Sequence, residues 1–435
     1  MFSPRHDWKH LAKRPEFQEP VIDGVRAIAI LWVLAFHLVF YHSYALPAQA
    51  RAILTNPATA WIARGTLGVD LFFVISGFLM GSILFGEFKK SGDLIFSRFY
   101  VRRLLRLIPV YTAAMMIALY FLHSLPGLPR WGNAENSWAN ILYVNNFLPY
   151  SKQYMTWCWS LAIEEQFYLL LPACILVFMG LGKGRVWILV SLLVLSGVIR
   201  YVIIHIYGVV PPFRSAPYTP RFNYMVDVEY DKPYMRFGGL LAGTAGAYLS
   251  CYRMPELKRF FARRGLITAI CLGCFAVMAH IALTPNGSQF FDRIPYLARE
   301  IWWALHRDVF SLAAIFLILA AIHTPALFGD WFRQLLAWKG FYSVAQLSYS
   351  IYLVSEMVFR WLFPRIAPLF APSLGGFVTM ALDSAIGLLM TFLIAASLYV
   401  MIERPCMRMR SHPIVLNLID FFRQPKLKPV AREVE

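Results

Sequence analysis

The sequence predicts an all-α polytopic membrane protein with about ten transmembrane helices and both termini in the cytoplasm. Hydrophobic residues make up 59% of its 435 residues, and charged residues make up only 15%. The mean hydropathy of +0.55 lies outside the range of ordinary soluble globular domains. Apolar stretches long enough to cross a bilayer recur along the chain. This composition excludes an ordinary soluble enzyme or binding module.

Each apolar stretch is expected to form one helix, because about 20 residues at roughly 1.5 Å per residue cross the hydrocarbon core. The ten stretches lie at 22–44, 67–86, 107–123, 159–180, 186–207, 234–251, 266–283, 307–323, 346–366 and 376–402. They form a single membrane domain, 22–402, which follows an N-terminal segment, 1–21, and precedes a basic tail, 403–435.

The basic residues predict how these helices are oriented. An even number of helices places both termini on the same side of the membrane. The connections on that side hold 26 Lys and Arg residues, whereas the opposite connections hold 9. Basic residues collect in cytoplasmic loops, so both termini are predicted to be cytoplasmic. The net charge of +17 is therefore interpreted as a topology signal, and no nucleic-acid partner is expected.

The first apolar stretch carries two ionisable residues, Arg26 and His37, eleven positions apart. At about 100° per residue, both side chains project from the same helix face, roughly 16 Å apart along the axis. Ionisable groups inside a membrane are costly and usually functional. Two simpler interpretations stay open: Arg26 extends to the interface beside Asp23, and His37 packs through one interhelical hydrogen bond.

Two carboxylates are expected at a depth similar to that of His37. They are Glu164, about 8 Å from the outer surface on the fourth helix, and Asp70, near the outer start of the second. Adjacent glutamates point about 100° apart, so Glu164 is expected to face the pore while Glu165 pairs elsewhere, for example with Arg236. A neutral imidazole oriented by a carboxylate can accept a proton or attack an acyl carbon. A structural salt bridge is the alternative for Glu164.

Arginines cluster just before the third span. Arg98, Arg102 and Arg106 repeat every four residues and therefore share one helix face, and Arg103 lies beside them. Arginine clusters suit phosphate groups because the guanidinium forms forked, charge-assisted hydrogen bonds. A basic helix next to a membrane also suits anionic lipid. The cluster thus predicts either a phosphate site or a lipid contact.

Aromatic residues gather in and beside two long outer connections, 124–158 and 208–233. Trp131, Trp138, Trp157, Trp159, Tyr218 and Tyr224 are the members of this group. Such residues are typical of the aromatic belt at a membrane surface, and a surface for a sugar-like acceptor is the alternative.

The six cysteines fall mostly in apolar segments and match neither a disulfide framework nor a zinc-site spacing. No metal is expected.

Seven segments together resemble the acyltransferase type 3 family of membrane-bound acyltransferases. They are Asp23-Gly24-Val25-Arg26 followed by His37, GVDLFFVISGF at 68–78, Arg103-x-x-Arg106 followed by Pro109 and Tyr111, WSLAIEEQFY at 159–168, RFGG at 236–239, LSYSIYL at 347–353, and Glu403-Arg404-Pro405. Each segment alone is weak, but their order and spacing across most of the chain are specific.

The resemblance implies a ten-helix enzyme that transfers an acyl group from acyl-coenzyme A on the cytoplasmic side, often to a cell-envelope carbohydrate on the outer side. Arg26 and His37 match the family's Arg-x10-His pair, and Arg103 with Arg106 matches its basic loop pair. One departure stands out: many members have a histidine where this chain has Ser355 followed by Glu356. A second histidine is therefore not expected here.

The leading hypothesis is O-acyl transfer, with acetyl as the expected group, from acetyl-CoA or another acyl-CoA to a hydroxyl of an envelope glycan or glycolipid, in a bacterial inner membrane. The arginines at 26, 98, 102, 103 and 106 would hold the donor. His37 would act as general base or take the acyl group covalently, oriented by Glu164 or Asp70. A proton-coupled transporter of a small solute or lipid-linked sugar, and an inactive scaffold for envelope synthesis, are the rival hypotheses.

Overall fold

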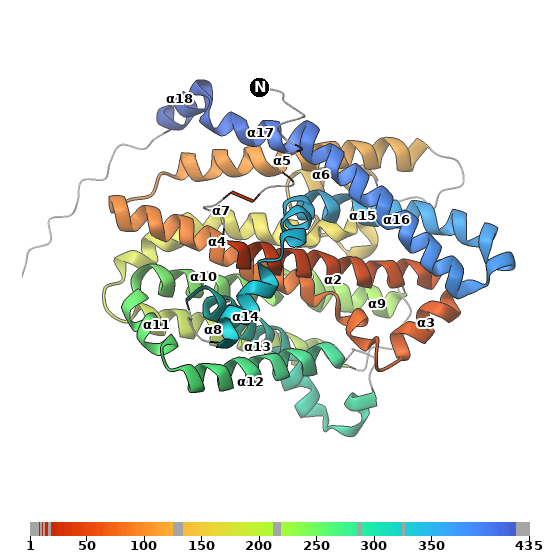
Figure 1. Ribbon diagram of the computed structural model, residues 1–435, viewed down its shortest axis with the longest axis horizontal. Helices are drawn as coiled ribbons and strands as arrows, with labels where there is room; N and C mark the ends of the chain where they lie inside the picture. The colour runs from red at the N-terminus through yellow and green to blue at the C-terminus, as the bar shows by residue number, and fades with distance from the viewer. Residues whose placement is uncertain are drawn as a thin grey trace, which may run out of the picture.

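Helices account for the regular structure of this chain, as the apolar stretches predict. The computed structural model (Figure 1) describes residues 8, 11, 14–15, 19–124, 134–211, 219–284, 289–323 and 327–422. Within these ranges the regular elements are helices, and no strand occurs. The predicted all-α fold is confirmed. Trp131 and Tyr218, together with most of 1–21 and with 423–435, lie outside the described residues.

Ten long helices coincide with the ten predicted stretches. They are α2 (Pro20–Ala45), α4 (Leu67–Ser91), α5 (Phe96–Ser124), α7 (Trp159–Gly180), α8 (Arg185–Tyr207), α10 (Phe237–Tyr252), α12 (Arg264–Leu283), α13 (Tyr296–His323), α15 (Lys339–Leu374) and α16 (Gly376–Leu398). Eight of them contain segments that are long and apolar enough to cross a membrane. The other two are α10, which has only 16 residues, and α15, whose 36 residues include charged ones. The chain is an integral membrane protein.

Shorter helices lie between the long ones and after the last of them. They are α3 (Pro47–Thr55), α6 (Ser137–Ile141), α9 (Pro220–Met225), α11 (Met254–Phe261), α14 (Leu327–Leu336), α17 (Arg404–Arg408) and α18 (Pro413–Phe421). Three further turns matter for the site: the 3-10 turn Ala60–Arg64 and the π-helical turns Val226–Tyr230 and Tyr399–Glu403.

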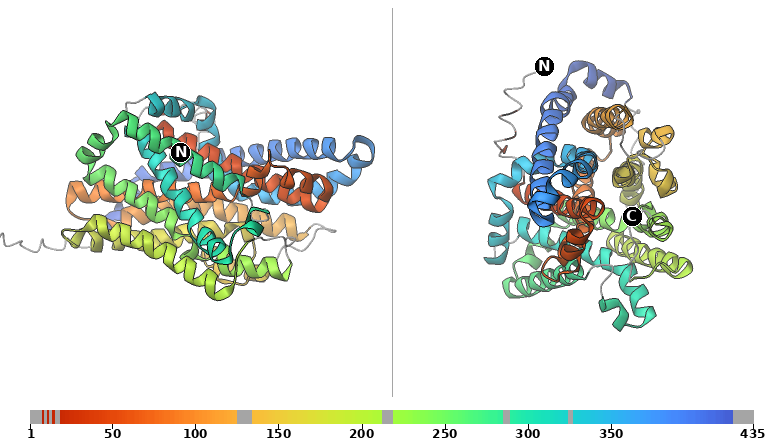
Figure 2. Two further views of the ribbon diagram at one scale, coloured as in Figure 1. Left: turned by 90° about the horizontal axis from the view of Figure 1, so that it is seen from below. Right: turned by 90° about the vertical axis from the view of Figure 1, so that its right-hand side faces the viewer.

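Helix α2 lies inside the bundle and packs against α4 and α15, while α4 packs closely against α10. The α4–α10 contact depends on glycine. A Cβ atom on Gly77 would lie 2.1 Å from the carbonyl oxygen of Leu240, and one on Gly243 would lie 2.0 Å from that of Val74. Small residues let helix backbones approach in this way. Helices α15 and α16 form an antiparallel hairpin that extends beyond the neighbouring helices (Figure 2).

Contacts between helices show which helix ends lie together. Arg26, near the start of α2, contacts Ser348 on α15, and Glu403, just after α16, contacts Ser350 on the same helix. The start of the first long helix and the end of the last therefore meet at one end of the bundle, as an even number of crossings requires. We call this the Arg26 end, and the end that holds Asp70 the Asp70 end. Their assignment to the cytoplasm and the outside, respectively, stays a prediction.

Candidate functional site

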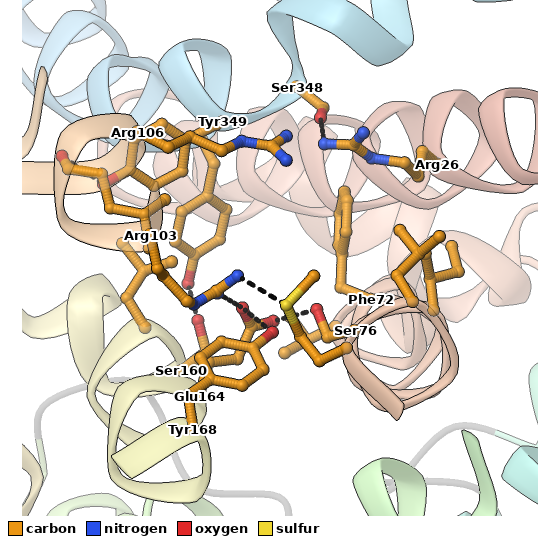
Figure 3. A pocket seen from close by; sticks show the side chains of 17 residues that line it. Arg26, Phe72, Ser76, Arg103, Arg106, Ser160, Glu164, Tyr168, Ser348 and Tyr349 are labelled. Atoms are coloured by element: carbon orange, nitrogen blue, oxygen red, sulfur yellow. Dashed lines mark hydrogen bonds and ion pairs between the residues drawn. The ribbon is translucent and has the colours of Figure 1, made fainter. Parts of the chain in front are cut away.

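A cavity of about 760 Å³ opens between α2, α4, α5, α7 and α15. Arg26, Arg103, Arg106 and Glu164 line it, together with serine, tyrosine and apolar side chains (Figure 3). Three of the five arginines predicted to hold a donor are thus brought together by two helices, α2 and α5.

Arg26 and Arg106 point toward each other across this cavity (Figure 3). The Nη2 atom of Arg26 donates to Ser348 Oγ over 3.3 Å, which gives the guanidinium a neutral partner. Arg106 has no hydrogen bond or ion pair with another residue in the part of the chain that the structure describes. Glu403 is the nearby carboxylate that acts electrostatically on both arginines. Both arginines therefore keep donors directed at the cavity.

Arg103 differs from these two because carboxylates neutralise it. Its Nη2 atom lies 3.3 Å from Glu165 and 3.9 Å from Glu164, and its guanidinium stacks 3.3 Å from the ring centre of Tyr168. The expectation that Glu165 would pair with Arg236 is wrong. Glu165 lies on the same side of its helix as Tyr168, and its carboxylate pairs with Arg103 instead. Arg103 is held in place by α7 rather than left available for an anion.

Glu164 lines the large cavity beside Arg103. Its carboxylate accepts hydrogen bonds from Ser76 over 3.1 Å and from Tyr168 over 3.2 Å. Among the described residues no hydrogen bond or ion pair joins Glu164 to His37. Glu164 thus belongs to the arginine-lined cavity, and the sequence-based pairing of Glu164 with His37 is wrong.

Arg98 and Arg102 lie outside the cavity. Arg98 is 40% exposed and forms an ion pair with Glu87 over 3.5 Å, and Arg102 is exposed. The helical repeat predicted that these two residues share a face with Arg106. Most of that face lies outside the cavity, and Arg106 is the one member of the repeat that lines the cavity. Arg103 also lines the cavity, although it is not part of this repeat.

His37 lines a second, smaller cavity of about 260 Å³. Its Nε2 atom lies 3.1 Å from Glu356 Oε1, and Tyr41 donates a hydrogen bond to the other oxygen of the same carboxylate. His37 Nδ1 is buried and has no hydrogen-bond partner among the residues described. With a proton on Nε2 donated to Glu356, Nδ1 carries the lone pair that can act as a base.

Glu356 is therefore the carboxylate that orients His37, in place of Glu164 or Asp70. Sequence reasoning noted Glu356 as a departure from related chains but gave it no role, and it missed Tyr41 altogether. A signal was present, because Tyr41 follows His37 by four residues and so shares its helix face.

The two cavities adjoin. Val69 and Tyr352 line both of them. Tyr352 is fixed in this position, because its hydroxyl hydrogen-bonds to the Trp157 carbonyl and to Ser160 Oγ. Two side chains thus separate the arginine-lined cavity from the His37 cavity.

Asp70 lies at the other end of the bundle in a buried ion network. Its two oxygens accept from Arg236 over 3.0 Å and from Arg307 over 2.5 Å. Asp70 has no hydrogen bond or ion pair with His37 among the described residues, so its predicted role as the orienting group is wrong. Both of its partners lie on helices far away in sequence.

The described residues contain no group of three or more His, Cys, Asp or Glu side chains that could hold a metal ion.

Comparison with known proteins places this geometry in a family. A family model described as an acyltransferase domain matches residues 19–400. The chain is 29% identical over 353 residues to the peptidoglycan O-acetyltransferase OatA of Listeria monocytogenes, covering 77% of this chain and 48% of the relative. It is 27% identical over 415 residues to O-acetyltransferase OatA of Staphylococcus aureus, covering 92% and 59%.

A third relative is Nose resistant to fluoxetine protein 6 of Caenorhabditis elegans. The two chains are 25% identical over 378 residues, and this match covers 78% of this chain and 45% of the relative. The chain thus spans about half the length of the curated relatives it matches. No solved structure matches. Because the family model covers nearly the whole membrane domain, the chain belongs to the acyltransferase type 3 family.

Proposed function

We propose that this protein transfers an acyl group, with acetyl as the expected group, from acyl-coenzyme A to a hydroxyl of a cell-envelope glycan. Two relatives are O-acetyltransferases by name, and one of these acts on peptidoglycan. The observation that carries the proposal is the pair of adjoining cavities, one lined by arginines and the other by the His37–Glu356 pair.

The larger cavity supplies the donor site. Arg26 and Arg106 present charge-assisted hydrogen-bond donors across this cavity. A diphosphate group of coenzyme A suits such a pair, since guanidinium groups bind phosphate oxygens in a forked geometry. The pantetheine arm would then extend past Val69 and Tyr352, and it would bring the thioester to His37.

His37 performs the proton transfer. The acceptor hydroxyl oxygen attacks the thioester carbonyl carbon while its proton moves to His37 Nδ1. The carbon–sulfur bond then breaks, and the thiolate leaves with that proton. Glu356 holds the Nε2–H and stabilises the imidazolium that forms between the two steps, which is the usual task of a carboxylate beside a catalytic histidine. In the covalent variant His37 Nδ1 attacks the carbonyl carbon itself, and the acyl group passes to the acceptor afterwards.

The test compares wild type with His37→Ala in detergent or nanodiscs, using labelled acetyl-CoA and a soluble glycan fragment. Replacing a general base typically lowers a rate by about 10²- to 10⁴-fold, and we expect a loss in this range. Labelled acetyl phosphate runs in parallel, so that transfer from it alone would show a different donor. Transfer at equal rates by both proteins, or no turnover of any donor by folded wild type, would refute the proposal.

A further inference from the structure

The buried ion network at the Asp70 end contacts the wall of the His37 cavity through one residue, Arg236. Arg236 is 2% exposed and precedes the first turn of α10. Its Nη1 atom donates to Asp70 over 3.0 Å, and Asp70 is held in turn by Arg307 on α13. The guanidinium of Arg236 therefore has a fixed position between three helices.

Two aromatic rings lie against this guanidinium. Its central carbon is 4.8 Å from the ring centre of Trp159 and 4.5 Å from that of Tyr230. The Nε atom of Arg236 also donates to the Tyr230 carbonyl over 2.7 Å, so both the backbone and the ring of Tyr230 are anchored. Such cation–π contacts are stronger when they are shielded from water.

Trp159 and Tyr230 also line the cavity that holds His37 and Glu356. Their ring centres are 4.8 Å apart and their planes are tilted by 58°, so they form one continuous aromatic surface. Neither ring forms a hydrogen bond with His37 in the described structure. The positions of both rings are fixed by Arg236, which lies outside the cavity, and not by His37.

We propose that Trp159 and Tyr230 form the surface on which the hydroxyl-bearing group of the acceptor rests, and that Arg236, anchored by Asp70, is the positioning residue for this surface. The inference rests on the function proposed above and assigns the acceptor side of it. A sugar presents C–H groups on its ring faces and hydroxyls at its edge. An aromatic surface buries the faces, and His37 Nδ1 remains free for a hydroxyl.

The contrast with the donor side supports this division. The cations that face the large cavity, Arg26 and Arg106, are available to an anion, whereas Arg236 is paired with a carboxylate and a carbonyl and lies against two rings. A cation that is paired with a carboxylate and does not line the cavity acts on the shape of the neighbouring cavity rather than on a ligand's charge.

The chain offers a matched control in the same buried region. Arg200 on α8 and Asp308 on α13 form an ion pair of 3.2 Å, and Arg200 is 1% exposed. Arg200 also donates to the Trp303 carbonyl, and neither Arg200 nor Asp308 lines either cavity. Loss of this pair therefore reports the cost of disturbing a buried ion pair that lies outside both cavity walls.

The experiment measures KM for acetyl-CoA, KM for a soluble glycan fragment and kcat in Arg236→Lys, Tyr230→Leu, Tyr230→Phe and Arg200→Lys. Lysine keeps the charge beside Asp70 but cannot stack on two rings, and phenylalanine keeps the ring that leucine removes. We expect about a tenfold rise in KM for the glycan in Arg236→Lys and Tyr230→Leu, by analogy with the loss of about one aromatic contact. KM for acetyl-CoA should stay within twofold, Tyr230→Phe should restore the glycan KM, and Arg200→Lys should leave both KM values unchanged.

A second measurement separates this inference from the proposed function. Binding of the glycan fragment without donor is followed by isothermal titration calorimetry, which needs no turnover. Weakened binding in Arg236→Lys and Tyr230→Leu, but not in Arg200→Lys, supports the inference even if acetyl-CoA proves not to be the donor. Equal glycan affinity in all four variants, or parallel changes in both KM values, would overturn it while leaving His37 chemistry intact. Size-exclusion profiles verify that each variant is folded.

Discussion

The two ends of the bundle both hold buried or partly buried arginines, but they use them differently. At the Arg26 end, Arg26 and Arg106 face a cavity, and the hydrogen-bonded partner of Arg26 is the neutral Ser348. At the Asp70 end, Arg236 and Arg307 share the carboxylate of Asp70. A buried cation that is paired supports the fold, whereas one that faces open space is available to a ligand. Cavity and pairing together, and not the presence of arginine, distinguish the two ends.

Asp70→Asn is expected to have the largest effect, because it removes the carboxylate that two buried arginines share. The amide leaves Arg236 and Arg307 buried without a counter-charge, and breaking a buried pair costs about 3–5 kcal/mol of the free energy of unfolding. Thermal unfolding in detergent should show a clear drop in midpoint. Glu87→Gln is the control, because it removes a surface ion pair with Arg98 that contributes about 0–1 kcal/mol. Equal midpoints for the two variants would contradict a structural role for the Asp70 network.

Arg106→Gln tests the opposite end. Hydrogen bonds to charged groups contribute about 1.5–3 kcal/mol, so KM for acetyl-CoA should rise about 10- to 100-fold while the unfolding midpoint changes little. Arg98→Gln serves as the matched control, since Arg98 lies on the same helix but outside the cavity. An unchanged KM in Arg106→Gln, or the same rise in Arg98→Gln, would show that the cavity does not hold the donor.

Glu356→Gln sharpens the account of His37. Glutamine can still accept a hydrogen bond from Nε2, but it cannot stabilise an imidazolium by its charge. The difference between a charged and a neutral hydrogen bond is about 1 kcal/mol, so kcat should fall about five- to tenfold with KM for the donor unchanged. Steady-state kinetics across acetyl-CoA concentrations measure both quantities. If kcat keeps its wild-type value, Glu356 only packs against His37.

A further prediction concerns the pH dependence of stability and rests on Asp231, which follows the turn Val226–Tyr230. Burial raises the pKa of Asp231 from 3.8 to about 6, although Lys232 and Gln153 contact its carboxylate. The folded protein therefore binds the proton more tightly than the unfolded chain does. This tighter proton binding contributes fully to the free energy of unfolding below about pH 4, and the contribution is lost as the pH rises toward 6.

Unfolding midpoints of wild type and Asp231→Asn between pH 4 and 7 check this linkage. The unfolding midpoint of the variant should rise relative to that of wild type as the pH rises. The difference between the two midpoints should level off above about pH 6. A difference that is constant across this range, or one that changes in the opposite direction, would contradict a buried carboxyl at this position.

Local sequence patterns predicted the helices well, because each depends on one continuous apolar stretch. All ten stretches are helical, and Arg26 and His37 project from one face of α2 toward a cavity each, as their spacing of eleven residues requires. The same spacing argument predicted a shared face for Arg98, Arg102 and Arg106, but a shared face did not place all three in the cavity.

Pairings between helices could not be derived from depth alone. Glu164 and Glu356 both carry carboxylates inside the bundle, yet only Glu356 contacts His37, because α15 runs parallel to α2 and packs directly against it. Depth along the membrane normal is one coordinate. The choice between two carboxylates inside the bundle depends on the lateral arrangement of the helices.

By itself, the sequence determined the all-α membrane fold, the family and the same-face pair Arg26 and His37, since these follow from hydropathy, short motifs and helical period. Only the tertiary structure decided that Glu356 orients His37, that Arg103 is neutralised by α7 and that Asp70 anchors Arg236. The physical reason is that each of these contacts joins helices distant in sequence, and their partners are selected by lateral packing, which no local period encodes.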